Sequence, residues 1–231
     1  MAIKVIRVTK VYESSGNSTF KLHAVKNVSM DINEGSYTLL LGPTGSGKTT
    51  LLSLIAGIVE PTKGEIVFNN IYITSSNDSK ISQFRERYIG YVPQTNLFIK
   101  ELNVIENILS PNSFLKRQMR HLKTYAMEML EKLNMDRKAG MKPFELSGGE
   151  MKKAMIVRAL VKKPLFILAD EPFSELDSGS TKSVMALLKE QRENGSAIIV
   201  ASHDQLSFEK EIDLYTLAEG QVVTYEKRGV K

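Results

Sequence analysis

Gly42-Pro43-Thr44-Gly45-Ser46-Gly47-Lys48-Thr49 fits the phosphate-binding pattern GxxxxGK[ST]. The stretch lies between an apolar run, residues 37–41, and a helix-like run that begins at Thr50. Its glycines permit turns in which successive backbone N–H groups point at one anion. The following helix directs the positive end of its dipole at the same point. A strand, a glycine-rich loop and a helix in this order predict a cradle for a triphosphate.

Two side chains at the end of the loop extend this prediction to a metal ion. Lys48 brings a positive charge to the outer phosphates, and the Thr49 hydroxyl stands where a phosphate-bound Mg²⁺ needs an oxygen ligand. We therefore expect a nucleoside triphosphate and Mg²⁺ as the ligands of residues 42–50.

Length and composition set broad bounds. The chain has 231 residues, of which 42% are hydrophobic, so it can bury a full core, and we expect one domain over residues 1–231. No apolar run approaches the roughly 20 residues of a transmembrane helix, and the N-terminus does not resemble a signal sequence. The expectation is a soluble, cytoplasmic protein. The absence of cysteine excludes disulfides and thiolate metal sites.

The chain is basic, with a formal net charge of +5 and a pI near 9.2, so nucleic-acid binding has to be considered. Its positive residues are dispersed. One cluster has the spacing of a single helix face: Lys116, Arg117, Arg120, His121 and Lys123. A solvated face is the favoured interpretation, and contact with a membrane partner, anionic lipid headgroups or nucleic acid are the alternatives.

Hydrophobic periodicity and turn residues give a coarse secondary structure. Strands are predicted at residues 2–8, 26–40, 87–92, 165–169 and 197–201, hairpins at 65–73 and 213–225, and helices after the loop up to Gly57, within 103–160 and at 178–194. The continuous apolar runs at 165–169 and 197–201 are typical of buried parallel strands.

Two carboxylates, Asp170 and Glu171, end the apolar run 165–169. In a doubly wound sheet the ligand lies at the carboxyl ends of the strands, so both would face the crevice that holds the phosphate loop. Asp170 suits the role of holding Mg²⁺, and Glu171 that of orienting and deprotonating an attacking water. A positioned base contributes on the order of 10² to 10⁴ in rate.

His203 ends the run 198–202, again at the carboxyl end of a predicted strand. An isolated histidine is more often structural than functional. In the company of the other motifs, we interpret its imidazole as a bridge between the terminal phosphate and the water held by Glu171.

Leu146-Ser147-Gly148-Gly149-Glu150, the signature segment, opens a further helix. Ser147 and Glu150 form a capping box, and the helix is predicted to run from Met151 to Val161. A well-capped helix with no other role is the alternative. Two glycines at a helix start cost about 1 kcal/mol each relative to alanine, so something must approach their backbone closely. We interpret the segment as a second phosphate-binding surface. One triphosphate cannot readily contact both this surface and the phosphate loop of the same compact domain.

With these motifs in this order, the chain resembles the ATP-binding subunit of an ABC transporter over nearly its whole length. In that family the sequence LSGGQ contacts the γ-phosphate of ATP held by the opposite subunit. The resemblance implies that Ser147, Gly148, Gly149 and Glu150 act across a dimer interface.

The same resemblance assigns three more residues. Tyr12 resembles the aromatic residue that stacks on adenine, a contact worth roughly 1 to 3 kcal/mol. Gln94 resembles the Q-loop glutamine that touches Mg²⁺ and the water and couples to the membrane subunit. Asp177, in Ser174-Glu175-Leu176-Asp177, resembles the D-loop residue that joins the two active sites.

The resemblance also implies an architecture and partners. The fold would be α/β, a P-loop NTPase core with a mainly parallel sheet, an N-terminal antiparallel β subdomain and an inserted helical subdomain at about residues 95–160. Two MgATP would be sandwiched in a homodimer, or in a dimer with a close paralogue. The dimer would act on a transmembrane permease from the cytoplasmic face of the membrane, with Leu97 and Phe98 either as permease contacts or as a local hydrophobic anchor.

Several positions depart from the commonest pattern of the family. Glu150 replaces glutamine, Met151-Lys152-Lys153 follows where glutamine and arginine are frequent, and Phe173 stands where threonine is common. None of these changes removes a group expected to contact phosphate or metal. The narrower resemblance is to lipoprotein-releasing, macrolide-exporting and peptide-resistance ATPases.

Two other functions are compatible with the same nucleotide site. One is an ATPase that signals through a membrane complex without transport, as in cell division. The other is an ATPase acting on nucleic acid. Such proteins usually carry a long coiled-coil insertion, zinc-binding cysteines or a duplicated cassette, and this sequence has none of them. We therefore expect no nucleic-acid partner.

Overall fold

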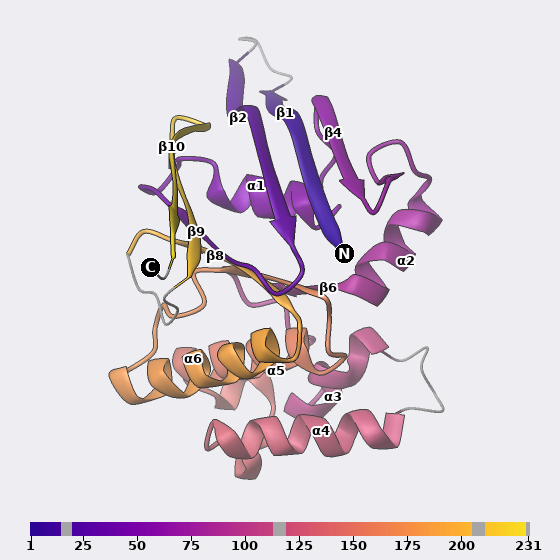
Figure 1. Ribbon diagram of the computed structural model, residues 1–231. Coiled ribbons are helices and arrows are strands. Elements are labelled where there is room, and N and C mark those ends of the chain that lie inside the picture. The colour runs from indigo at the N-terminus through magenta and orange to yellow at the C-terminus, as the bar shows by residue number, and fades with distance from the viewer. Residues whose placement is uncertain (15–19, 113–118, 205–210, 230–231) are drawn as a thin grey trace.

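The computed structural model describes residues 1–14, 20–112, 119–204 and 211–229, which form two sheets and six α-helices (Figure 1). The strands are β1 Ala2–Ser14, β2 Phe20–Asn33, β3 Tyr37–Leu41, β4 Lys63–Phe68, β5 Ile71–Tyr72, β6 Ile89–Val92, β7 Phe166–Asp170, β8 Ala197–Ser202, β9 Ile212–Ala218 and β10 Gln221–Arg228. The helices are α1 Lys48–Ile55, α2 Asp78–Tyr88, α3 Val104–Leu109, α4 Met119–Lys132, α5 Gly148–Leu160 and α6 Ser178–Glu193. Among the described residues, none of these helices has the length and apolar character needed to cross a membrane.

The two sheets differ in strand direction. The first is antiparallel, in the order β2-β1-β4-β5. The second has the order β10-β9-β3-β8-β7-β6, in which only β10 runs antiparallel to its neighbour. Helices α3, α4 and α5 all lie between β6 and β7 in the chain. The α/β fold with an antiparallel sheet beside a mainly parallel one is confirmed.

The second sheet is covered on both faces, because its strands are apolar on both sides. Leu40 and Leu168 pack with α1 and the first sheet, whereas Leu39 and Ile167 pack with α3 to α6. This alternation follows from the two-residue period of a strand. Figure 1 shows α1 between the two sheets and α3 to α6 on the opposite face of the second sheet.

The predicted strand at residues 26–40 is wrong, because it is two strands in different sheets. β2 ends at Asn33, a turn follows in which Ser36 N donates to Asn33 O, and β3 begins at Tyr37. Gly35 adopts a φ of 71° in this turn. The break lies in the short turn-forming stretch Asn33-Glu34-Gly35-Ser36, which the prediction included in the strand.

The predicted strand at 87–92 begins too early, since Arg87 and Tyr88 are the end of α2. That helix was not predicted. Only Ile81 and Phe84 are buried along it, so the helical period of apolar residues is weak. Its start is marked by Asn77, whose side chain accepts a hydrogen bond from Lys80 N.

Other predicted elements are confirmed. α1 ends just before Gly57, α6 begins at Ser178, and β9 and β10 form the terminal hairpin around Glu219 and Gly220. α5 begins at Gly148, three residues before the predicted start, because both glycines of the signature segment belong to its first turn.

Candidate functional site

Sheet topology brings three predicted motifs to one edge. β3, β8 and β7 are adjacent and parallel, so their carboxyl ends lie side by side. The phosphate loop follows β3, His203 follows β8, and Asp170 is the last residue of β7.

The phosphate loop is clamped by segments distant in sequence. Gly47 caps α1 with a φ of 100°, and a Cβ atom there would lie 2.2 Å from the Ala24 carbonyl oxygen on β2. Gly220 N donates to Ser46 O at 3.1 Å, and Lys26 N donates to Gly220 O at 2.7 Å. The loop conformation therefore requires glycine at position 47 and depends on both β2 and the terminal hairpin.

Lys48 is buried inside the loop. Its Nζ donates to Gly42 O at 2.6 Å and to Pro43 O at 3.1 Å, and the residue is 7% exposed. These bonds hold the ammonium over the loop whose backbone N–H groups would bind phosphate.

A pocket of about 580 Å³ surrounds the loop and gathers most of the predicted ligand-binding residues. Its lining includes Tyr12, Thr44, Gly45, Ser46, Gly47, Lys48, Thr49, Thr50, Gln94, Asp170 and Glu171. The Tyr12 ring is 41% exposed and has the Lys10 ammonium 5.1 Å from its centroid. The roles assigned to these residues stay predictions, but the fold places them around one cavity.

Sequence reasoning missed the other side of this pocket, which is lined by Lys21, Leu22, His23, Ala24, Lys26 and Glu219. The first five belong to β2, where Tyr12 pairs with Leu22. Glu219 belongs to the turn of the terminal hairpin. The hairpin itself was predictable, but no local signal in the sequence placed either segment beside the phosphate loop.

The Asp170 carboxylate has the properties of a ligand for a cation. The residue is 1% exposed, and neither carboxylate oxygen has a hydrogen-bond partner among the described residues. Burial raises the pKa of Asp170, an effect that the nearby Thr49 hydroxyl and Lys48 ammonium oppose. Buried carboxylate oxygens without partners are costly unless a cation or donor meets them. Together with the Thr49 hydroxyl they offer the oxygen ligands that Mg²⁺ prefers, so the residues fit this ion.

Glu171 lines the pocket and pairs with His203, which is not itself among the lining residues. Glu171 Oε1 lies 3.0 Å from His203 Nδ1, and the Glu171 side chain is 14% exposed. Glu171 has a φ of 46°, and its N–H donates to Ala201 O on β8 at 2.9 Å. The hydrogen bond to Glu171 raises the pKa of His203. The Glu171 carboxylate is therefore held between the ends of β7 and β8. A general base for a water that attacks the terminal phosphate would have to lie at this position.

The signature segment has the predicted capping box. Ser147 Oγ accepts from Glu150 N at 3.3 Å, and Glu150 Oε2 accepts from Ser147 N at 3.0 Å. Ser147 and Gly148 line a separate depression of about 290 Å³, which shares Gln94 with the nucleotide pocket. Within the described part of the chain, the residues that line the nucleotide pocket include none of Ser147, Gly148, Gly149 and Glu150.

One of the paired glycines has an intrachain explanation that the sequence did not reveal. A Cβ atom on Gly149 would lie 2.8 Å from the Glu175 carbonyl oxygen, whereas one on Gly148 would meet only the end of the flexible Glu175 side chain. The D-loop backbone of the same chain therefore approaches Gly149 closely, and the phosphate contact expected of both glycines stays a prediction. Asp177 caps α6, since its Oδ1 accepts from Ser180 N at 2.8 Å, a bond that lowers the pKa of Asp177.

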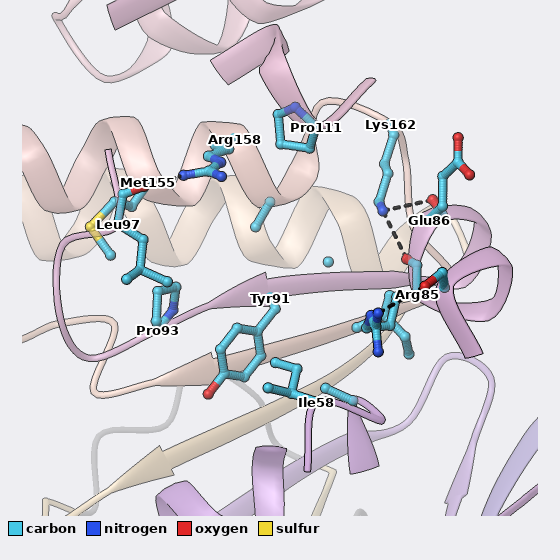
Figure 2. Close-up of a pocket in the computed structure, with 15 residues that line it drawn as sticks. Ile58, Arg85, Glu86, Tyr91, Pro93, Leu97, Pro111, Met155, Arg158 and Lys162 are labelled. Carbon is cyan, nitrogen blue, oxygen red and sulfur yellow. Dashed lines mark hydrogen bonds between the residues drawn. The ribbon is translucent and has the colours of Figure 1, made fainter. Parts of the chain in front are cut away.

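A groove of about 340 Å³ lies between α2, β6 and α5 (Figure 2). Its lining combines apolar side chains with mainly cationic ones: Ile58, Tyr91, Leu97 and Met155 with Arg85, Arg158, Lys162 and the carboxylate Glu86. Leu97 is 59% exposed, whereas Phe98 is buried with the Arg158 guanidinium 5.7 Å from its ring. Of the two residues considered as permease contacts, Phe98 is therefore the local anchor.

Lys162 closes one end of this groove. Figure 2 shows its Nζ donating to the Arg85 and Glu86 carbonyls, at 2.9 and 2.6 Å. Burial lowers the pKa of Lys162 to about 8.

This lowered pKa predicts a pH dependence of stability. Because Lys162 binds its proton more weakly in the folded chain than in the unfolded one, its charge is a cost below pH 8 that is relieved as the pH rises toward about 10.4. The unfolding free energy of the parent chain should therefore rise relative to that of Lys162→Met, by about 1 to 3 kcal/mol between pH 7.5 and 10. Urea unfolding of both chains at these pH values measures it, and parallel pH profiles would contradict the assignment.

The basic cluster is only partly described. Arg120, His121 and Lys123 are exposed on α4, whereas Lys116 and Arg117 lie outside the described residues.

Comparison with known proteins gives consistent matches. A family model described as "ABC transporter" matches residues 25–174. The lipoprotein-releasing system ATP-binding protein LolD of Buchnera aphidicola is 34% identical over 97% of both chains. The dimeric structure of the ABC transporter cassette MJ0796 has a TM-score of 0.89 and 33% identity, and covers 99% of this chain and 100% of that one. A second dimeric structure of that cassette, in a post-hydrolysis state bound to ADP and Pi, has the same TM-score, 34% identity and the same coverage.

Proposed function

The chain belongs to the ABC transporter family of ATP-binding, ATP-hydrolysing cassettes, and from that premise we propose that two copies close around two MgATP to drive a membrane permease. One observation carries the proposal. The phosphate loop, Asp170 and Glu171 line one pocket, while the signature segment lines a different depression. A second chain, a copy or a close paralogue, is needed to bring a signature segment to the terminal phosphate.

In this scheme each chain holds its own nucleotide. Residues 42–50 surround the phosphates with backbone N–H groups, and Tyr12 stacks on the adenine. Thr49, Asp170 and Gln94 would hold Mg²⁺, which when bound offsets the negative charge of the phosphates. Lys48 neutralises the same charge from the loop side.

The chemical step is the attack of water on the terminal phosphate. Glu171 accepts the proton of the water, and the bond from His203 fixes the orientation of the carboxylate. The partner chain adds Ser147, Gly148, Gly149 and Glu150 over the terminal phosphate, and Asp177 links the two sites.

Closure depends on which nucleotide is bound. Neither chain alone surrounds the terminal phosphate, so ATP stabilises the closed dimer more than ADP does, and hydrolysis removes that preference. We propose that the whole chain is one ATP-binding domain and that residues from about 95 to 160 form a helical subdomain that moves during closure.

The groove of Figure 2 is the surface that we assign to the permease. It adjoins Gln94 through the exposed segment that includes Leu97, and it offers apolar and cationic side chains to one partner segment. Through this contact the chain would sit peripherally at the cytoplasmic face of the membrane.

Dilution of the purified chain tests the proposed dimer. If only the closed dimer hydrolyses ATP, turnover per chain should rise with protein concentration and level off once dimers dominate. The measurement is phosphate release at saturating MgATP over about three decades of protein concentration, a range that spans most of a simple association curve. Turnover per chain that stays constant down to the lowest concentration would reject the half-site arrangement.

A further inference from the structure

A buried lysine connects the signature helix to the Q loop. Lys152 lies on α5, near the start of the helix, and is 3% exposed. Its Nζ donates to the backbone carbonyl of Gln94 at 3.2 Å. Gln94 lies just beyond β6, where the chain leaves the sheet for the helices 104–160. One hydrogen bond therefore joins two elements. One is the helix that carries the signature segment, and the other is Gln94, which we expect to contact Mg²⁺ and the attacking water.

The charges around Lys152 explain how a buried ammonium is tolerated there. Burial lowers the pKa of Lys152, and the negative charges of Glu175, Asp170 and Glu171 oppose this effect. An ammonium group has three N–H donors. Burying its charge destabilises the folded chain unless negative groups compensate for the lost contacts with water. The side chain therefore sits where the Q loop, the D-loop and the two catalytic carboxylates all favour its charge.

This arrangement is particular to the residue found here. The signature segment is followed by Met151-Lys152-Lys153, where glutamine and arginine are frequent in the family that the chain resembles. A neutral glutamine would provide an N–H donor for the Gln94 carbonyl but no charge for Glu175. Lysine provides both, and its flexible stem reaches across the boundary between the helices and the sheet.

We propose that Lys152 is a positioning residue for Gln94, which ties the Q loop to the signature helix so that the helix position sets where the Gln94 amide lies. The inference rests on the proposed function, because it needs Gln94 at the metal and the signature segment at the partner's phosphate. Dimer closure would then complete the lid over one terminal phosphate and align Gln94 beside the other in a single movement. A displacement of about 1 Å in a positioned group can cost about 10²-fold in rate.

Four chains test this inference: the parent, Lys152→Met, Lys152→Gln and the matched control Lys153→Met. Lys153 lies next along the same helix and donates to the Leu133 carbonyl at 3.4 Å, away from the Q loop. We expect Lys152→Met to lower kcat at least tenfold, with MgATP affinity and Tm close to those of Lys153→Met. Lys152→Gln retains an N–H donor and should recover at least a third of the lost rate. Steady-state kinetics, equilibrium nucleotide binding and thermal unfolding provide the readouts.

The possible outcomes test the positioning role of Lys152 separately from the proposed function. If the parent hydrolyses ATP and Lys152→Met keeps the kcat of Lys153→Met, the positioning role is rejected and the proposed function stands. If kcat, nucleotide affinity and Tm fall together in both Lys152 variants, the residue is structural only, and the inference is again overturned. A parent chain without ATP turnover would reject the proposed function itself.

Discussion

Glu171→Gln is expected to lower ATP turnover by about 10² to 10⁴ while MgATP binding remains. The amide is nearly isosteric with the carboxylate and can still bond His203, but it cannot accept the proton of an attacking water. Glu171 is held by Ala201 O through its backbone and by His203 through its side chain, so the substitution should leave the site geometry intact. Phosphate release and equilibrium nucleotide binding measure the two effects separately.

The matched control for this substitution is Glu193→Gln, at an exposed position near the end of α6 that belongs to none of the predicted motifs. It should leave turnover at the parental level. If Glu171→Gln also retains parental turnover, Glu171 is not the base, and another group must accept the proton.

Ser147→Arg is expected to abolish ATP-induced association while each chain still binds nucleotide. Ser147 is exposed at the start of α5 and lines a depression separate from the nucleotide pocket, so the arginine does not enter the pocket of its own chain. It would instead fill the space into which the partner's terminal phosphate has to fit. Turnover should fall at least as far as in Glu171→Gln, about 10²-fold or more, because no complete site can form.

Ser147→Ala separates the two consequences of this change. Both variants lose the cap that Ser147 Oγ provides to Glu150 N, a loss of about 1 kcal/mol in stability. Only the arginine blocks the phosphate position. Thermal unfolding should therefore shift similarly in the two variants, whereas association should fail completely in Ser147→Arg alone. A parental dimer in Ser147→Arg would rule out a signature segment acting across the interface.

The features predicted correctly from the sequence are those with local causes. The strand, loop and helix around Lys48 follow from one apolar run, three glycines and a second apolar run. Residues close in sequence also determine the capping box of Ser147 and Glu150 and the turn at Glu219 and Gly220. Asp170, Glu171 and His203 were found because each stands at the end of a buried apolar run, where polar side chains are uncommon unless they have a function.

The features that were missed depend on distant partners. The run at 26–40 alternates like one strand, yet Gly35 turns it from one sheet into the other. Ala24 and Gly220 hold the phosphate loop from far along the chain, which no local pattern reveals. The close approach expected at the signature glycines is found at Gly149, next to the backbone of Glu175. Only the folded chain shows that Glu175 makes that approach.

Sedimentation velocity of Glu171→Gln provides the most direct test of a site shared by two chains. With MgATP the variant should sediment as a dimer that retains two nucleotides, and with MgADP it should sediment as single chains. Material that stays monomeric with MgATP at high concentration, while isolated parental chains hydrolyse ATP at the full rate, would contradict the account.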